Sequence, residues 1–159
     1  MAQEIERKFL MVSDVWKQHV TGSTLLRQGY LSSNAKATVR VRTQDDSEAV
    51  LTIKGPPRGI SRAEYEYAIP MEDAREMLEL AEPNTVEKRR HLVPFAGLVW
   101  EVDVFEGRHA GLVLAEVELT HEKEQVPLPP WVGDEVTQDD RYNNASLARA
   151  DGPPGAEPA

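Results

Sequence analysis

The chain contains no cysteine among its 159 residues. Neither a disulfide framework nor a zinc site with thiolate ligands is therefore available to it. The four histidines, His19, His91, His109 and His121, show none of the spacings typical of metal ligands. Any metal ion would have to be held by carboxylates, which are the ligands that suit Mg²⁺ or Mn²⁺.

Long apolar runs are missing as well. None approaches the roughly 18 residues that a membrane-spanning helix needs, and charged residues begin at Glu4. We therefore expect a cytoplasmic protein with no membrane partner. The formal net charge of −9 argues against nucleic acid as a partner, because binding phosphates along a strand requires a basic surface. An acidic protein can still hold a basic pocket.

The composition is that of a globular protein. Apolar residues make up 40% and charged residues 28%, and the length suits one domain with a proper core. We expect this single domain to span residues 1–150. Residues 151–159, DGPPGAEPA, offer nothing to bury and are predicted to form a disordered C-terminal tail.

The segment EIERKFL places Glu4, Glu6 and Lys8 at alternate positions, with Ile5 and Phe9 on the other parity. In a β-strand the three charged side chains would share one face, with the two carboxylates starting roughly 6–7 Å apart. They could lean together around a small divalent cation, with Lys8 beside it to meet an anionic ligand. Taken alone, the pattern is also typical of an amphipathic strand with one wet face.

The same alternation recurs along the chain. It predicts about eight strands, at residues 4–10, 25–31, 37–43, 50–55, 61–69, 86–93, 99–105 and 114–120. Helices are fewer: helical spacing predicts one in residues 70–83, and shorter ones are expected at 13–19, after a Ser13 cap, and at 143–150. Many strands with short connections favour an antiparallel sheet that closes on itself.

Charges of one sign are paired on the predicted strands. Basic pairs fall at 40/42 and 88/90, and acidic pairs at 64/66, 101/103 and 116/118. Like charges two residues apart repel each other, most strongly in a low-dielectric interior. A polyanion with its divalent cations would offset this repulsion. We therefore expect a barrel with a charged lumen and outward apolar faces; the alternative is a sheet whose charged face meets bulk water.

These segments, in this order, resemble the CYTH superfamily of triphosphate tunnel metalloenzymes. EIERKFL matches its N-terminal E-x-E-x-K signature, and the segments RQGYL, VRVR, LTIKG, SRAEYE, VEKRR, EVDVF and AEVEL follow. DEVTQDDRYNNASLA resembles the C-terminal segment of its short bacterial members. The resemblance, which covers residues 3 to about 149, implies an α+β, mainly β fold: a closed eight-stranded antiparallel β-barrel with a few helices packed outside. It also implies Mg²⁺ or Mn²⁺ as cofactor, with two ions when substrate is bound.

The resemblance assigns site residues by matching position. The expected triphosphate ligands are Lys8, Arg40, Arg42, Lys54, Lys88 and Arg90, to which the inward parity adds Arg62. The expected metal ligands are Glu4, Glu6, Glu116 and Glu118, with Glu64, Glu66 and Asp103 available for a second ion or the attacking water. Tyr30 and Lys88 resemble a Tyr–Lys pair implicated in proton handling and are expected to be catalytic. Alternatively, Lys88 only binds phosphate and the metal activates the water.

The chain length and short loops resemble those of short bacterial enzymes that hydrolyse inorganic triphosphate. The first expectation is therefore a metal-dependent hydrolase that cleaves tripolyphosphate to diphosphate and phosphate. The alternatives are a class IV-type adenylate cyclase, another organic triphosphatase and a non-catalytic polyphosphate-binding module. The expected partner is a small-molecule triphosphate. The sequence leaves open whether the protein forms a homodimer. The segment around Arg141 and Tyr142 is expected to close one end of the tunnel, which would exclude long chains.

Overall fold

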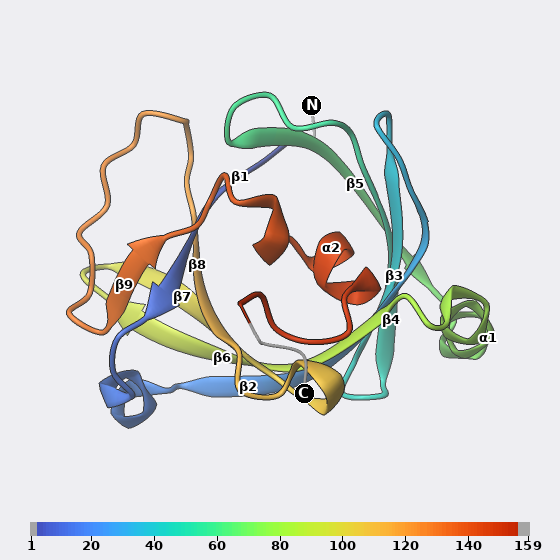
Figure 1. Ribbon diagram of the computed structural model, residues 1–159, viewed down its shortest axis with the longest axis horizontal. Coiled ribbons are helices and arrows are strands. Elements are labelled where there is room, and N and C mark those ends of the chain that lie inside the picture. The colour runs from blue at the N-terminus through green and yellow to red at the C-terminus, as the bar shows by residue number, and fades with distance from the viewer. Residues whose placement is uncertain (1–2, 156–159) are drawn as a thin grey trace.

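The computed structural model describes residues 3–155 (Figure 1). Within this range the chain forms nine strands and two α-helices. The strands are β1 (Gln3–Met11), β2 (Gly22–Ser33), β3 (Thr38–Gln44), β4 (Glu48–Lys54), β5 (Ser61–Ile69), β6 (Thr85–Phe95), β7 (Leu98–Phe105), β8 (Val113–Glu118) and β9 (Val132–Glu135). The helices are α1 (Met71–Ala81), α2 (Asn144–Arg149) and the short 3₁₀ helices η1 (Val15–His19), η2 (Gly107–His109) and η3 (Asp140–Tyr142).

The strands close into a ring through β1. They follow the order β5-β4-β3-β2-β6-β7-β8-β1-β9, with every pairing antiparallel and with β5 also paired to β1. The start of β1 pairs with β5, and Glu6 to Leu10 then pair with β8. Figure 1 looks through the resulting opening. The predicted closed eight-stranded antiparallel barrel is confirmed, with β9 as one additional strand beside β1.

Apolar side chains cover the outside of the barrel, as predicted. Phe9, Trp100 and Trp131 belong to one buried cluster, and the rings of Trp100 and Trp131 lie 5.7 Å apart edge to face. Trp131 comes from the long connection between β8 and β9, so this segment shields the outward faces of β1 and β7 from water. The tunnel wall is therefore supported from behind by close packing.

Helix α1 covers a second outward face, over β2, β3 and β4. The close approach of its C-terminal end depends on Gly29 of β2. A Cβ atom at Gly29 would lie 2.6 Å from the Cβ of Ala81, which is closer than two carbon atoms can pack. Glycine at this position therefore lets the helix lie directly on the strand.

Two expectations about the helices need correction. The helix expected at 13–19 is the 3₁₀ helix η1, whose cap position is Asp14 rather than Ser13, although the Ser13 hydroxyl accepts a hydrogen bond from the Val15 N–H at 3.3 Å. Helix α2 is not packed outside the barrel as α1 is; it lies within the ring of strands (Figure 1). Its buried Leu147 and Ala148 pack against apolar side chains at one end of the lumen.

The end of the chain follows α2 as bends and turns over residues 151–155. Residues 156–159 lie outside the described part, so the disordered tail expected over 151–159 and the domain boundary at 150 stay predictions. Among the described residues, no helix is long and apolar enough to cross a membrane.

Candidate active site

Carboxylates gather on one wall of the lumen because of the register between β1 and β8. Glu6 lies opposite Glu118, and Lys8 lies opposite Glu116. Directly opposed residues of antiparallel strands share one face, so these side chains all point into the barrel. Glu4 continues the wall toward β5, where it faces Arg62.

Basic side chains occupy the strands across the lumen. Arg40 and Arg42 point inward from β3, opposite Tyr30 and Gln28 of β2. Further basic side chains come from β4 and β6, namely Lys54, Lys88 and Arg90. The lumen therefore brings an acidic and a basic wall face to face, and the paired like charges of the sequence meet opposite charges from distant strands.

Ion pairs join the two walls. The Lys54 ammonium donates to both carboxylate oxygens of Glu4 at 3.0 Å. The Arg90 guanidinium donates to both oxygens of Asp103 at 2.8 and 2.9 Å, and it also reaches Glu116 at 3.3 Å. Lys8 lies 3.5 Å from Glu116. Each of these contacts is shielded from solvent, where charge pairs interact more strongly than at a surface.

Two cavities run through the charged region. The larger, about 330 Å³, is lined entirely by charged side chains and Asn144. The smaller, about 140 Å³, lies between the barrel wall and the C-terminal segment and is lined by Lys8, Tyr30 and Arg62 among others. Glu4, Glu6, Arg40 and Lys54 line both, so the two spaces meet in the middle of the lumen.

Most predicted site residues line one or both cavities. They are Glu4, Glu6, Lys8, Tyr30, Arg40, Arg42, Lys54, Arg62, Glu64, Glu66, Arg90, Glu116 and Glu118. Lys88 and Asp103 lie behind this lining, where they pair with each other at 2.7 Å. The structure thus gathers the predicted residues in one lumen, and their individual roles stay predictions.

The basic wall carries donors that the protein itself leaves unused. The buried Nε of Arg40 has no hydrogen-bond partner, and Arg42 forms no ion pair among residues 3–155. Burial, together with the nearby Arg40 and Arg90, lowers the pKa of Arg42 to about 9. A buried unpaired cation is costly, so an anionic ligand would be strongly favoured at this wall.

The acidic wall shows the opposite imbalance. Burial, with Glu116 and Glu4 close by, raises the pKa of Glu6 to about 8. Burial also favours the protonated form of Glu4, but Lys54 outweighs it and lowers the pKa of Glu4 to about 2. On this wall, the surroundings of Glu6 thus disfavour its charged form. A cation placed beside Glu6 would offset its repulsion with Glu4 and Glu116.

The donor set of this wall suits a hard divalent cation. Only carboxylate oxygens are available, and Glu6 and Glu118 lie on directly opposed positions of adjacent strands. In the described part of the chain, no three carboxylate or imidazole groups converge closely enough to hold a metal ion as they stand. Several of the acids instead bind lysine or arginine. A metal ion would have to replace those contacts.

The predicted catalytic residues have separate surroundings. Burial lowers the pKa of Lys88 to about 8, although Asp103 opposes this effect. The Lys88 ammonium donates to the Asn144 side chain at 3.0 Å. The Tyr30 hydroxyl instead accepts a hydrogen bond from Gln28 at 3.0 Å. No hydrogen bond joins Tyr30 to Lys88 within the range that the structure describes.

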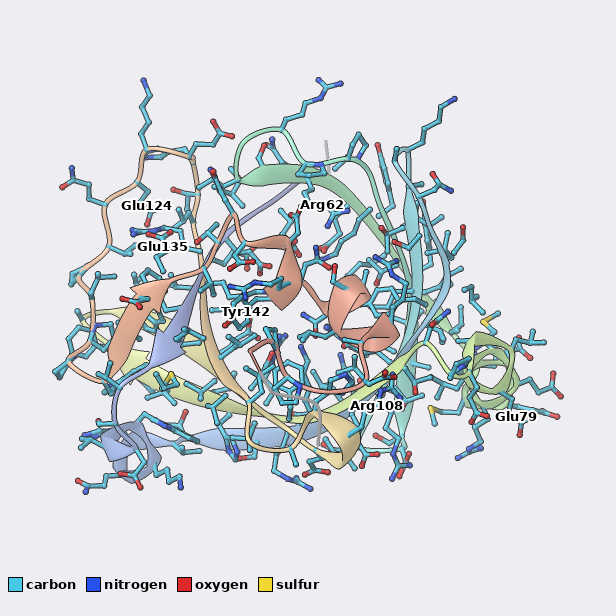
Figure 2. All side chains as sticks on the ribbon, viewed as in Figure 1. Arg62, Glu79, Arg108, Glu124, Glu135 and Tyr142 are labelled. Atoms are coloured by element: carbon cyan, nitrogen blue, oxygen red, sulfur yellow. The ribbon has the colours of Figure 1, made fainter. Side chains whose placement is uncertain are left out.

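The C-terminal segment closes one end of the lumen, as expected. Figure 2 shows Tyr142 inside the ring of strands. Its backbone carbonyl accepts a hydrogen bond from Lys8 at 3.1 Å, while its side chain, with Leu147, packs against Phe105 and Leu114. The segment thus fills the apolar end of the lumen and touches two lysines of the charged region, Lys8 and Lys88.

Sequence reasoning missed several lining residues. Asn143, Asn144 and Thr137 line the cavities from the C-terminal segment, and Glu101 lines the larger one from β7. Alternation had already placed Glu101 with Asp103 in an acidic pair, but no site role was predicted for Glu101. No local signal in the sequence indicates that the polar residues before and within α2 turn into the barrel.

Comparison with known proteins identifies the family. The profile described as "CYTH domain" matches residues 2–149, which is nearly the whole chain. The chain belongs to the CYTH domain family. The predicted family resemblance is thereby confirmed, and the ordered strand motifs are those of a CYTH domain.

Proteins similar in sequence to this chain carry the name of an activity. A protein named inorganic triphosphatase from Acetivibrio thermocellus is 46% identical over 150 residues, covering 94% of this chain and 95% of that protein. One of the same name from Nitrosomonas europaea is 37% identical over 148 residues, covering 91% and 96%. A crystal structure of an inorganic triphosphatase matches with a TM-score of 0.67 at 35% identity, covering 94% of this chain and 97% of that one.

Proposed function

We propose that the chain is a metal-dependent hydrolase that cleaves inorganic triphosphate to diphosphate and phosphate within the lumen. The observation that carries this proposal is the basic wall: among residues 3–155, the Nε of buried Arg40 has no hydrogen-bond partner and Arg42 forms no ion pair. A tripolyphosphate would supply negative charge to both. Relatives that align over nearly their whole length carry the name of this activity.

The basic side chains bind and orient the substrate. Cleavage of a phosphoanhydride asks mainly for positioning and for stabilisation of charge on the leaving diphosphate. Arg40, Arg42, Lys54 and Arg90 would hold phosphate oxygens from the basic wall, with Lys8 on β1 from the other side. Because Lys8 and Lys54 are paired with Glu116 and Glu4, substrate would compete for these lysines.

The acidic wall would hold the metal. Glu4, Glu6, Glu116 and Glu118 are the proposed ligands, with Glu64 and Glu66 across the lumen for a second ion. A bound Mg²⁺ or Mn²⁺ would supply Lewis-acid stabilisation of phosphate oxygens and would acidify water. We further propose that two Mg²⁺ or Mn²⁺ ions bind together with the substrate and that the protein is cytoplasmic. Whether it forms a homodimer is a question for experiment.

Lys88 is the proposed proton acceptor for the attacking water. Its pKa of about 8 lets a useful fraction of the amine be neutral near neutral pH. Asp103 and Asn144 hold its Nζ in place. The plainer alternative, in which Lys88 only contributes positive charge, predicts a fall in kcat as the ammonium loses its proton.

The lining of the larger cavity argues against adenylate cyclase chemistry as the first choice. It consists of charged side chains and one amide, and it offers no aromatic or apolar surface for an adenine ring. Recognition of a base usually requires such a surface. A substrate made only of phosphates needs none.

The direct test is phosphate release from tripolyphosphate, ATP and thiamine triphosphate with Mg²⁺. We expect strong release from tripolyphosphate by the wild type and loss of it in Glu4→Gln. Glu87→Gln is the matched control, since Glu87 lies on the outer face of β6 beside Arg27. Activity that survives Glu4→Gln would contradict the proposed metal site, and cyclic AMP formed from ATP would favour the cyclase.

A further inference from the structure

Gln28 is a fully buried polar residue in the wall of the lumen. Its exposed fraction is 0%, and it lies on β2 two residues before Tyr30, on the same inward face. It does not line either cavity, and both ends of its amide are bonded to other side chains, so it is placed to act through its neighbours. Its two partners do line them: Tyr30 the smaller cavity and Arg42 the larger one.

The Gln28 amide bridges these two residues. The Nε of Arg42 donates to the Gln28 Oε1 at 2.9 Å. The Gln28 Nε2 donates to the Tyr30 hydroxyl at 3.0 Å. The register places Gln28 opposite Arg42 across the β2–β3 ladder, so the bridge is held by two hydrogen-bonded strands.

The chemistry of the three groups dictates the direction of these hydrogen bonds. A guanidinium group only donates, so the Gln28 oxygen must face Arg42. The amide nitrogen must then face Tyr30, and an amide NH₂ group also only donates. The Tyr30 oxygen is therefore the acceptor in this contact. Its own proton is left to point elsewhere. Tyr30 borders two open spaces, the smaller cavity that it shares with Lys8 and Arg40 and another that it shares with Asn84 and Arg149. The first contains the cations that we expect to hold the substrate.

We propose that Gln28 is a positioning residue that holds the Tyr30 hydroxyl as a hydrogen-bond donor toward a phosphate oxygen of the substrate. The inference rests on the proposed function and deepens it. Because the bridging group is a neutral amide, Arg42 is oriented without being neutralised and keeps its full charge for the same anion. A carboxylate at position 28 would do the reverse, by accepting from both Arg42 and Tyr30.

A double-mutant cycle tests the coupling. Gln28→Met, Tyr30→Phe and the double variant are compared for kcat on tripolyphosphate, with thermal unfolding to establish that each is folded. We expect Gln28→Met to lower kcat about tenfold in the wild-type background but less than about twofold in the Tyr30→Phe background. Equal losses in both backgrounds, or wild-type activity in Tyr30→Phe, would overturn the proposal.

Thr52→Val is the matched control. Thr52 is also 0% exposed and inward-facing, and its hydroxyl accepts a hydrogen bond from Arg40 at 3.2 Å. Its loss therefore removes a buried polar contact to a different arginine without touching Tyr30. We expect the effect of Thr52→Val to be the same factor in the wild-type and Tyr30→Phe backgrounds.

Gln28→Glu keeps the shape of the residue and serves if the methionine variant fails to fold. The carboxylate would accept a hydrogen bond from the Tyr30 hydroxyl, which could then no longer donate to substrate. The kcat should therefore fall about as far as in Tyr30→Phe and should not fall further in the double variant. If the variant acted only through its added negative charge, it would raise KM by the same factor in the wild-type and Tyr30→Phe backgrounds and would leave kcat unchanged. Wild-type kcat in Gln28→Glu would overturn the inference alone, whereas a wild-type protein that neither binds nor cleaves tripolyphosphate would refute the proposed function on which it rests.

Discussion

The Nζ of Lys88 lies 2.7 Å from an oxygen of Asp103, and the two side chains are 0% and 1% exposed. Arg90 binds the same carboxylate through two hydrogen bonds. Burial opposes ionisation of Asp103, but Arg90 and Lys88 hold its pKa well below the usual range. One carboxylate thus supports two cations of the basic wall.

Removal of this carboxylate should destabilise the fold. Asp103→Asn leaves buried Lys88 without its counter-charge and leaves Arg90 with only Glu101 and Glu116 as partners. We expect a loss of about 3–5 kcal/mol in the free energy of unfolding. Urea denaturation would measure it. Asp46→Asn, which breaks the exposed pair with Arg27, should cost less than about 1 kcal/mol. Equal losses would mean that the buried pair contributes no more than a surface one.

The pH dependence of kcat separates the two roles considered for Lys88. Burial lowers its pKa to about 8, and only the neutral amine can accept a proton. If Lys88 is the base, kcat should rise tenfold per pH unit below pH 8 and level off above it. If Lys88 only contributes charge, kcat should fall above pH 8. In Lys88→Met, kcat should show neither the rise below pH 8 nor the fall above it.

Metal binding should release a proton. The folded-state pKa of Glu6 is about 8, above the ordinary value of 4.5, because of burial and then of Glu116 and Glu4. The metal-free fold therefore holds this proton at pH 7, and its stability should fall as the pH rises from about 4.5 through 8. A cation would displace the proton. Calorimetry in two buffers of different ionisation enthalpy should report release of about one proton at pH 7, and none in Glu6→Gln.

The contact between α1 and β2 gives a purely structural prediction. Gly29→Ala would place its Cβ 2.6 Å from the Cβ of Ala81, and either the helix or the strand must move. We expect a loss of about 1–3 kcal/mol in the free energy of unfolding. Gly22→Ala, whose nearest neighbour would be 3.7 Å away, is the control and should unfold at nearly the wild-type temperature.

Substrate length should depend on the C-terminal segment. Leu147 is fully buried at the closed end of the lumen, next to Phe105 and Leu114. Leu147→Ala loosens that end, so the rate on long polyphosphate relative to tripolyphosphate should rise. An unchanged ratio in the folded variant would show that the segment does not select chain length. Truncation after Pro130 is unsuitable, since it removes buried Trp131 and β9.

Local pattern accounts for most of the fold. Side chains two apart on a strand share a face, so alternation could assign Arg40 and Arg42, or Glu116 and Glu118, to one side before any strand was paired. Pairs of like charge on one strand after another favoured a lumen that binds a polyanion and cations. The order of these motifs then identified the CYTH family, because each motif lies on a strand whose inward residues line the tunnel.

Other features depend on contacts between distant segments. Glu4 meets Lys54 because barrel closure brings together β1 and β4, which are far apart in sequence. Asp103 meets Lys88 and Arg90 because of the register of the β6–β7 hairpin, in which Arg90 lies directly opposite Asp103. Gln28 looks like any polar strand residue until its neighbours in space are known.

Composition and period-two alternation by themselves determined the faces of the strands and predicted a closed barrel and a polyanionic ligand, because these patterns are set within a few residues of chain. Only the tertiary structure decided that Lys88 and Asp103 withdraw behind the cavity lining and that α2 turns into the lumen. Barrel closure creates the apolar ring of Tyr30, Phe105 and Leu114 that Leu147 covers. That ring is assembled from three different strands, so burial there is a property of the closed sheet and of no single segment.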